Sequence, residues 1–413
     1  MIQNKTGWLT LFACTAFLLT MLGGCGGDED TTSETALCAS QTSKSFVRPF
    51  EVDAGEYPFK SCAFQTGRGR MHFFDEGPRD AKETILMIHG NPTWSFLYRN
   101  IAKDMIAKGH RVIAVDHLGM GMSDAPELAE FDYLPRSHSA NLETFVKAMD
   151  LKNVTLVVQD WGGPVGLGMA TRQPQRIGRV MVMNTWAWSA NQANPGLDHG
   201  LLNWGQQATA LSKADPQFGC NTMLTLTAEQ LGMFYDPSKG ARYKMIRNAY
   251  LQPAIDPTTM KPLSARKCAA MSSFALAILA DNAYQGEVEA ALPKLQGKPY
   301  VVLSGLSDQL FGALRCNPAA SSPCPGISVC ECDPAYALAG ECGAPSTSAV
   351  RFDFMCKAGG SLIEQNADQW VRRMGTSSLW ARYAVPGAEH MVQELARDQV
   401  IAGLDKLLTA PQR

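Results

Sequence analysis

The most constraining feature of this 413-residue chain is a regular alternation of short apolar runs with longer stretches of helical periodicity. Uninterrupted apolar runs of about five residues are typical of strands that are buried on both faces of a parallel sheet. The runs are Thr84–Ile88, Arg111–Val115, Val154–Val158 and Arg179–Met183, and the helical patterns between them are Phe96–Lys108, Ser139–Asp150 and Pro164–Arg172. This order predicts a doubly wound, mostly parallel α/β sheet, with functional side chains at the carboxyl ends of the strands.

The alternation stops near Trp186 and resumes at Lys298. Residues 186–297 contain helical pieces with many Met and aromatic residues and no clear strand, so we expect an inserted helical cap. The core is then predicted in two parts, 46–185 and 298–413. The second part begins with a strand and ends with another strand and a helix: Tyr300–Ser304, Leu379–Val385 and Val392–Leu408.

The N-terminus predicts a targeting segment rather than a part of the fold. Residues 1–24 contain Lys5 and an apolar run that ends in Leu-Gly-Gly before Cys25. This arrangement resembles a bacterial lipoprotein signal, in which the cysteine is lipidated after cleavage; an ordinary secretory signal is the alternative. We therefore expect an exported protein on the periplasmic or cell-surface side, held to a membrane by Cys25 and a flexible tether over 25–45.

Cysteine usage agrees with export. Of twelve Cys, ten lie beyond the signal region, and an oxidising compartment predicts that such an even set forms disulfides. Six of them lie in a predicted Cys-rich insert at 313–357, for which a zinc site is the alternative. No His lies between Cys316 and Cys356 and the spacings do not repeat, so we predict no metal site. The net charge of −2 gives no reason to expect a nucleic-acid partner.

The strongest local signal is an aspartate at a predicted strand-to-helix turn. Asp160 follows an apolar strand and precedes Trp-Gly-Gly-Pro, which is the context of a nucleophile elbow. Val158 departs from the pattern, since glycine is usual two residues before the nucleophile. A helix-capping Asp is the alternative interpretation. A carboxylate here can displace a leaving group from a saturated carbon and form an alkyl ester, which a general base must then help to hydrolyse.

His390 is the candidate base and Asp308 is the acid that would orient it. His390 follows the last predicted strand, and Asp308 follows the strand Tyr300–Ser304. The chain order of nucleophile, acid and base is that of α/β-hydrolases. The other place for an acid, after the strand ending at Met183, holds Asn184, which carries no charge.

These motifs together resemble the haloalkane dehalogenases, which have an α/β-hydrolase fold with an inserted helical cap. The matching segments cover most of 57–408 and include Lys298-Pro299, Gly305–Gly312, residues 89–95 (His-Gly-Asn-Pro-Thr-Trp-Ser), residues 157–163 (Val-Val-Gln-Asp-Trp-Gly-Gly) and residues 388–394 (Ala-Glu-His-Met-Val-Gln-Glu). The resemblance implies hydrolysis of a small halogenated hydrocarbon to an alcohol and a halide ion, without a cofactor. The chain departs from the family by its lipoprotein signal and its Cys-rich insert.

In that family two N–H donors hold the departing halide. Trp161 matches one through its indole, and Asn91 matches the other through its side-chain amide. In a related subgroup a second tryptophan from the cap takes this role, which Trp186, Trp188 or Trp204 would supply. The backbone of the 89–94 loop and the N–H of Trp161 are expected to form the oxyanion hole.

Two other functions remain open at this stage. An epoxide hydrolase also uses an elbow Asp, with cap tyrosines that activate the ring oxygen; Tyr235, Tyr243, Tyr250 and Tyr284 are available. Asn91 and Gln159 argue against it, because that family usually has an aromatic residue and a His at these positions. The other alternative is a non-catalytic surface lipoprotein that retains the fold.

Overall fold

The structure is a computed structural model that describes residues 36–38, 46–191, 197–215, 217–225, 240–305, 308, 369–385, 388 and 390–411. The predicted signal segment 1–24, Cys25, most of the tether and the Cys-rich insert at 313–357 lie outside these residues. Within the described ranges, no helix has both the length and the apolar character needed to cross a membrane.

The described strands form one sheet in the order β1-β2-β3-β5-β4-β6-β7-β8-β9. The strands from β5 to β9 in this order run parallel to one another, whereas β1, β2 and β3 add antiparallel neighbours at the other edge. Their bounds are β1 Ala36–Cys38, β2 Cys62–Thr66, β3 Gly69–Glu76, β4 Thr84–Ile88, β5 Arg111–Val115, β6 Val154–Gln159, β7 Ile177–Met183, β8 Tyr300–Gly305 and β9 Leu379–Val385. The predicted mostly parallel sheet is confirmed.

The outermost strand β1 lies inside the segment predicted as a flexible tether, so that prediction is wrong for residues 36–38. Its backbone pairs with β2, where Cys38 lies opposite Cys62. Cys62 is disulfide-bonded. The strand was not predicted because its three residues lie in a polar segment, although they can pair with the free edge of β2.

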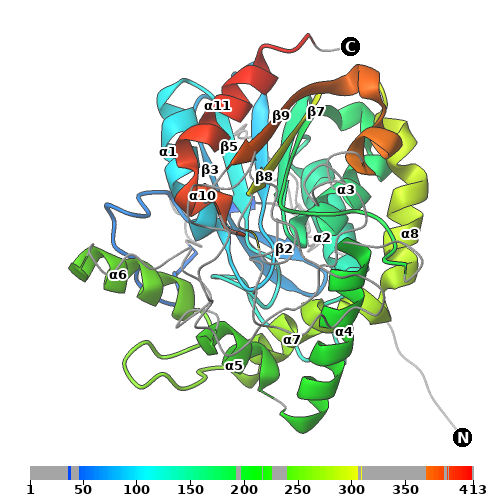
Figure 1. The fold of residues 1–413 in the computed structure, drawn as a ribbon. Helices are drawn as coiled ribbons and strands as arrows, with labels where there is room; N and C mark the ends of the chain where they lie inside the picture. Colours follow the sequence, from blue (N-terminus) through cyan, green and yellow to red (C-terminus); the bar gives the residue numbers. More distant parts are fainter. Residues whose placement is uncertain are drawn as a thin grey trace, which may run out of the picture. The chain divides into compact units, whose positions relative to one another are not determined.

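Helices cover both faces of the sheet (Figure 1). On one face, α1 (Arg99–Ala107) and α11 (Arg397–Leu408) lie together, and α11 packs on β7, β8 and β9. On the other, α3 (Gly162–Arg172) packs on β4 and β6 and against α2 (Pro135–Ala148). Every residue of β4 and β6 is buried, as two-sided coverage requires.

Several helices have bounds that differ from the prediction. Helix α3 begins at Gly162 rather than Pro164, and the predicted helix Val392–Leu408 is divided into α10 (Val392–Leu395) and α11. A 3-10 turn, Ser95–Tyr98, takes the first part of the segment expected to be helical, and α1 begins only at Arg99. Helix α2 begins at Pro135, four residues before the predicted start. Proline is favoured in the first turn because its φ already suits a helix and its missing N–H would have no partner there.

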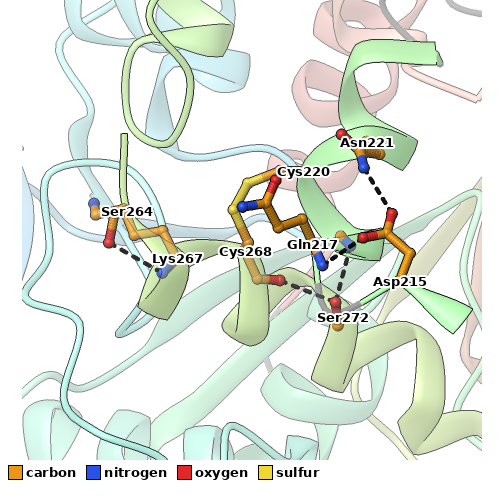
Figure 2. The surroundings of a disulfide bond; sticks show 9 residues. Asp215, Gln217, Cys220, Asn221, Ser264, Lys267, Cys268 and Ser272 are labelled. Atoms are coloured by element: carbon orange, nitrogen blue, oxygen red, sulfur yellow. Dashed lines mark hydrogen bonds between the residues drawn. A yellow bond between two sulfur atoms is a disulfide. The ribbon is translucent and has the colours of Figure 1, made fainter. Parts of the chain in front are cut away.

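Between β7 and β8, the described elements are helices, apart from an isolated β-bridge between Ile255 and Pro262, as expected for a helical cap. The helices are α4 (Leu197–Ala214), α5 (Phe218–Thr225), α6 (Gly240–Leu251), α7 (Ala265–Ala280) and α8 (Asn282–Ala291). Helix α7 packs against both α4 and α5. A disulfide between Cys220 and Cys268 joins α5 to α7, and both cysteines are fully buried (Figure 2).

Helix α7 also ties the cap to the core. The ammonium of Lys267 donates hydrogen bonds to the carbonyl oxygens of Gly121 (2.6 Å) and Ser123 (3.3 Å). Burial lowers the pKa of Lys267 to about 8, against the opposing charges of Asp116 and Asp124. Further along the same helix, Phe274 packs its ring on the indole of Trp161, with 5.6 Å between ring centroids. The cap therefore bears directly on the residue after Asp160.

Candidate active site

Asp160 lies at a sharp turn between β6 and α3. Its φ is +52°, in the left-handed region that non-glycine residues rarely occupy. The turn is held by hydrogen bonds: the N–H of Asp160 donates to the carbonyl of Asn184 (3.0 Å), and the hydroxyl of Thr185 donates to the carbonyl of Asp160 (2.5 Å). These bonds fix a strained backbone that directs the carboxylate out of the strand.

The turn needs glycine on both sides of the carboxylate. A Cβ atom on Gly90 would lie 2.2 Å from Asp160 Oδ1, and one on Gly162 would lie 2.2 Å from the carbonyl oxygen of Ile88. Val158 stands where glycine is usual before a nucleophile elbow, and a glycine further along α3 accommodates its larger side chain. A Cβ on Gly166 would approach Val158 Cγ1 to 2.7 Å, so glycine at 166 makes room for the valine.

The structure brings Asp160, His390 and Asp308 together in a buried cluster. Nε2 of His390 lies 3.2 Å from Oδ2 of Asp160, and Nδ1 of His390 lies 2.9 Å from Oδ2 of Asp308. The exposed fraction is 4% for Asp160, 7% for His390 and 0% for Asp308. This is the hydrogen-bonded order of nucleophile, base and orienting acid, although the catalytic roles remain predictions.

The two carboxylates determine the charge of the imidazole. Burial alone would lower the pKa of His390. The negative charges of Asp308 and Asp160 and their hydrogen bonds outweigh burial and raise the pKa of His390 to about 10. The imidazole is therefore protonated near neutral pH when Asp160 is a free carboxylate.

The loop after β4 supplies one donor to the nucleophile. The backbone N–H of Asn91 donates to Asp160 Oδ1 at 2.7 Å, as expected for an oxyanion-hole donor. Its side-chain Oδ1 is buried without a hydrogen-bond partner. The indole N–H of Trp161 also has no acceptor among the described residues, and Trp161 is 3% exposed. Two uncommitted amide and indole groups thus flank the carboxylate.

The other tryptophans considered as halide donors are engaged elsewhere. The indole N–H of Trp186 donates to Gln285 Oε1 at 2.6 Å. The Trp188 ring packs edge-on against Trp370, with 5.1 Å between ring centroids. The ring of Trp204 lies against Phe218 within the cap, with 6.3 Å between ring centroids. The bond to Gln285 argues against Trp186 as the second donor, and the assignment to Asn91 remains a prediction.

The cap tyrosines considered for an epoxide hydrolase also point to other partners. The Tyr250 hydroxyl donates to Glu394 Oε1 (2.6 Å), and the Tyr284 hydroxyl donates to the carbonyl of Pro164 (3.3 Å). Tyr235 and the side chain of Tyr243 lie outside the described part of the chain. Neither described tyrosine is hydrogen-bonded to the carboxylate of Asp160.

Two residues with a role in this geometry were not assigned one from the sequence. Asn184, with φ of +39°, bridges three strand ends: its carbonyl accepts from Asp160, its Nδ2 donates to the carbonyl of His390 (3.0 Å), and its Oδ1 accepts from the N–H of Gly305 (2.9 Å). Gln159 is the second, with Nε2 at 3.1 Å from His390 Nε2. Gln159 ends a strand and Asn184 directly follows one, and these positions were the sequence signal that could have identified both residues.

Beneath the site lies a fully buried polar network that explains the 116–124 loop. Asp116 accepts hydrogen bonds from His72 Nδ1 (2.8 Å), the N–H of Ser95 (2.7 Å) and the N–H of Met122 (2.8 Å). His89 Nε2 accepts from the N–H of His117 (3.0 Å). Burial lowers the pKa of His89, so it is a neutral scaffold residue rather than a second base. These contacts make the 116–124 loop part of the scaffold beneath the site.

Within the described ranges, no group of His, Cys, Asp and Glu could hold a metal ion. The described side chains at the site are one buried carboxylate, one imidazole held by a second carboxylate, and two uncommitted N–H-bearing side chains. Such a set can attack an electrophilic carbon and stabilise a leaving anion.

Comparison with known proteins identifies relatives of this chain. A family model described as the alpha/beta hydrolase fold matches residues 83–218. A cis-3-alkyl-4-alkyloxetan-2-one decarboxylase of Shewanella oneidensis is 30% identical over 269 residues, covering 62% of this chain and 75% of that protein. A haloalkane dehalogenase of Psychrobacter cryohalolentis is 40% identical over 149 residues, covering 36% of this chain and 46% of that protein. The match to the dehalogenase thus spans about half of its length.

Among solved structures, the haloalkane dehalogenase DpaA of Paraglaciecola agarilytica superposes with a TM-score of 0.55. The alignment has 20% sequence identity and covers 87% of this chain and 98% of that one. At this identity the match establishes the fold alone.

Proposed function

This chain belongs to the alpha/beta hydrolase family and is similar to its haloalkane dehalogenases, and from that premise we propose that it hydrolyses haloalkanes through an alkyl ester on Asp160. The observation that carries the proposal is the pairing of a carboxylate nucleophile with a buried imidazole at 3.2 Å. Serine hydrolases of this fold attack carbonyl groups, whereas a carboxylate suits displacement at a saturated carbon. The substrate is then a small halogenated hydrocarbon.

The first step is displacement of halide. Asp160 Oδ1 accepts the shorter hydrogen bond, from the N–H of Asn91 at 2.7 Å, whereas Oδ2 lies 3.2 Å from His390 Nε2, so Oδ2 is the oxygen we assign to the attack. The carbon–halogen bond breaks as the Asp160–carbon bond forms, and the halide leaves with the bonding electrons. The Trp161 indole N–H and the Asn91 side-chain amide stabilise the charge that develops on the halide.

The second step is hydrolysis of the ester. Esterification removes the charge of Asp160, one of the causes of the high pKa of His390, so the imidazole loses its proton to solvent more readily. The neutral imidazole then takes a proton from water, whose oxygen attacks the Asp160 carboxyl carbon. The alcohol leaves, and the oxygen atom from water stays in Asp160. Asp308 holds the ring in place throughout.

Trapping of the ester tests this proposal. His390→Gln removes the base and leaves Asp160 intact, so incubation with 1,2-dibromoethane should produce one covalent adduct on Asp160, detected by the mass of the intact protein and of its peptides. Asp160→Asn should show no adduct. An unmodified His390→Gln protein, together with a wild type that releases no bromide, would rule the proposal out.

An epoxide hydrolase is less well supported, because the described cap tyrosines are bonded away from Asp160. Tyr284 lies against α3, where a Cβ on Gly168 would approach its hydroxyl to 1.9 Å. The Tyr250 hydroxyl donates to Glu394 in a buried ion cluster. Incubation with styrene oxide should therefore give no diol at enzyme concentrations that release bromide from a bromoalkane.

A second candidate function follows from the similarity to the oxetan-2-one decarboxylase, which extends over more of the relative's length than the similarity to the dehalogenase. The chain covers 75% of the oxetan-2-one decarboxylase but 46% of the dehalogenase. The same carboxylate could open a four-membered lactone at its alkoxy carbon, giving an alkyl ester and a free carboxylate. Loss of carbon dioxide would then expel Asp160 and leave an alkene, with no water consumed.

Isotope labelling separates the two reactions. Turnover of a haloalkane in ¹⁸O-labelled water should place the label in Asp160, whereas turnover of an alkyl-substituted oxetan-2-one should not. Alkene detected by gas chromatography, without label in the Asp160 peptide and without halide release from a panel of chloro- and bromoalkanes, would assign the chain to lactone decarboxylation.

We also propose that the protein is exported and anchored through lipid on Cys25, on the basis of the signal-like segment before that residue. In a bacterial host, the wild type should incorporate labelled palmitate and partition into the detergent phase of Triton X-114. Cys25→Ser should lose both properties. Equal labelling of the two proteins would contradict the anchor.

A further inference from the structure

We propose that Gln159 is a positioning residue for His390, which it biases toward the neutral imidazole once Asp160 carries an alkyl group. The inference rests on the proposed function, because it requires the ester on Asp160. It goes beyond that function by assigning to an uncharged side chain the control of when the base becomes active.

The geometry places a donor and an acceptor at the same nitrogen. Gln159 is the last residue of β6 and is fully buried. Its Nε2 lies 3.1 Å from His390 Nε2 and 3.2 Å from the carbonyl oxygen of His390. Asp160 Oδ2 lies 3.2 Å from that same imidazole nitrogen. His390 Nε2 therefore faces a carboxylate on one side and an amide donor on the other.

Before alkylation, the carboxylate determines the hydrogen bonding. The imidazole is protonated, and its Nε2–H donates to Asp160. A protonated ring nitrogen cannot accept a hydrogen bond, so the amide of Gln159 bonds only to the His390 carbonyl. The amide oxygen of Gln159 is buried without a partner among the described residues, so the donor end of the side chain is the end that is used.

After alkylation, the amide can bond to the ring. The ester on Asp160 is neutral, and the deprotonated Nε2 has a lone pair that accepts from Gln159. A hydrogen bond to the neutral form of a base lowers its pKa. The amide keeps the His390 carbonyl as a second acceptor, so it can yield Nε2 to the attacking water.

The other groups around the ring do not supply this effect. Among the described residues, the carboxylates hydrogen-bonded to the imidazole are Asp308 at Nδ1 and Asp160 at Nε2. Asp308 keeps its charge in both states and always favours the proton. Asn184 donates to the backbone carbonyl of His390 rather than to its ring. Gln159 is thus the neutral donor placed to oppose Asp308 after the charge of Asp160 is lost.

Two variants of Gln159 test the proposal. Gln159→Met removes the donor at similar volume, and Gln159→Glu replaces it with a carboxylate. Gln393→Met is the control, since Gln393 is another fully buried glutamine, three residues after His390. Rapid mixing of each protein with a bromoalkane from pH 5 to pH 10 would record bromide release and alcohol release separately, with thermal melting as a check on folding.

The expected change lies in the alcohol phase alone. Its apparent pKa should rise by about half a unit to one unit in Gln159→Met. In Gln159→Glu it should rise by about one to three units, with alkyl-enzyme accumulating at neutral pH. The apparent pKa of the alcohol phase in Gln393→Met should match that of the wild type. If Gln159→Glu does not fold, Gln159→Met still tests the proposal.

The outcomes distinguish this inference from the proposed function. No bromide burst from the wild type would reject the alkyl-enzyme mechanism itself. A wild-type burst, with an alcohol phase whose apparent pKa is the same in the wild type and in each folded Gln159 variant, would reject the role of Gln159 and leave the mechanism standing. A general loss of both phases in Gln159→Met, at an unchanged pKa, would assign it a merely structural role.

Discussion

Asn91 contributes two different groups to the site. Its backbone N–H is bonded to Asp160, while its side-chain amide has no partner in the described part of the chain. Truncating the side chain therefore leaves the oxyanion contact in place and removes only the proposed halide donor. Trp161 offers the same separation, because phenylalanine keeps its packing on Phe274 and removes the indole N–H.

Asn91→Ala and Trp161→Phe should each lower kcat for a chloroalkane by about 10²–10³-fold, the usual effect of removing one donor from such a site. Both should also weaken bromide binding, measured by quenching of tryptophan fluorescence. Trp186→Phe is the control, because that indole N–H is already bonded to Gln285. Wild-type activity in Asn91→Ala would point instead to a cap residue as the second donor.

The lowered pKa of Asp116 leads us to expect that the stability of the protein depends on pH. Burial alone would raise its pKa, but the charge and hydrogen bond of His72, with His89 and the Met122 N–H, lower it to about 2. The folded pKa is below the unfolded one, so the stabilisation is present above about pH 4 and lost as the pH falls toward 2. It amounts to about 2 kcal/mol.

The free energy of unfolding, measured in urea between pH 2 and pH 6, tests this. Asp116→Asn should be less stable than the wild type at pH 6, and the difference should narrow by about 2 kcal/mol toward pH 2. The exposed Asp80 provides the control variant Asp80→Asn. A difference between wild type and Asp116→Asn that does not depend on pH would refute the assignment.

The sequence was sufficient to predict which residues meet at the site, but not all of the contacts between them. Asp160, Asp308 and His390 each follow a strand, and parallel strands bring their carboxyl ends to one edge. The bonds of Asn184 and Gln159 to His390 depend on a left-handed backbone and on side-chain rotamers, and they join residues more than 200 positions apart. No local pattern encodes such contacts.

At the scale of secondary-structure elements, β6 and α3 meet at a close contact. Val158 on the strand lies against Gly166 on the helix, where an added Cβ would be 2.7 Å from Val158 Cγ1. The valine replaces the small residue usual before an elbow, and the glycine compensates for it from the other side. Substitutions at the two positions should therefore have coupled effects on the free energy of unfolding.

Gly166→Ala should destabilise the protein by about 1–3 kcal/mol through overpacking. Adding Val158→Ala should recover part of this loss, so that a double-mutant cycle of denaturation free energies gives a favourable coupling between the two changes. Gly67→Ala is the control, because an added Cβ there would meet open space. Additive effects of Gly166→Ala and Val158→Ala would contradict this contact.

The elements themselves show which signals were reliable. The parallel strands β4 to β9 were predicted to within two residues, because an uninterrupted apolar run has few other structural uses, whereas β2 was not predicted. The starts of α1 and α2 differed more, since a 3-10 turn and a proline extend or shorten a helix without changing its apolar face. Strand β1 was missed because three residues in a polar segment carry almost no pattern.

At the scale of the whole molecule, a disulfide joins two helices of the cap, and helix α7 is one of the helices that bond the cap to the core. The Cys220–Cys268 disulfide closes a sequence separation of 48 residues (Figure 2). The neighbouring Lys267 donates to the carbonyl of Gly121 in the 116–124 loop. Removing the disulfide should raise the entropy of the unfolded chain and loosen the helix that presses Phe274 on Trp161.

The double variant Cys220→Ser, Cys268→Ser should be less stable by about 2–4 kcal/mol, read from denaturation curves. Bromide binding should weaken in parallel, since the cap positions the Trp161 indole. The single variant Lys267→Met separately tests the hydrogen bonds between α7 and the 116–124 loop. A double variant with wild-type stability and wild-type bromide affinity would show that the staple has no influence on the site.

The proposed nucleophile precedes its base by 230 positions, with the cap and the last two strands between them. During synthesis, Asp160 can fold into its turn well before His390 has left the ribosome. A chain that ended after the cap would lack both Asp308 and His390. If the proposed route holds, such a chain could not hydrolyse an alkyl ester on Asp160, so only a chain that extends past His390 would complete a turnover.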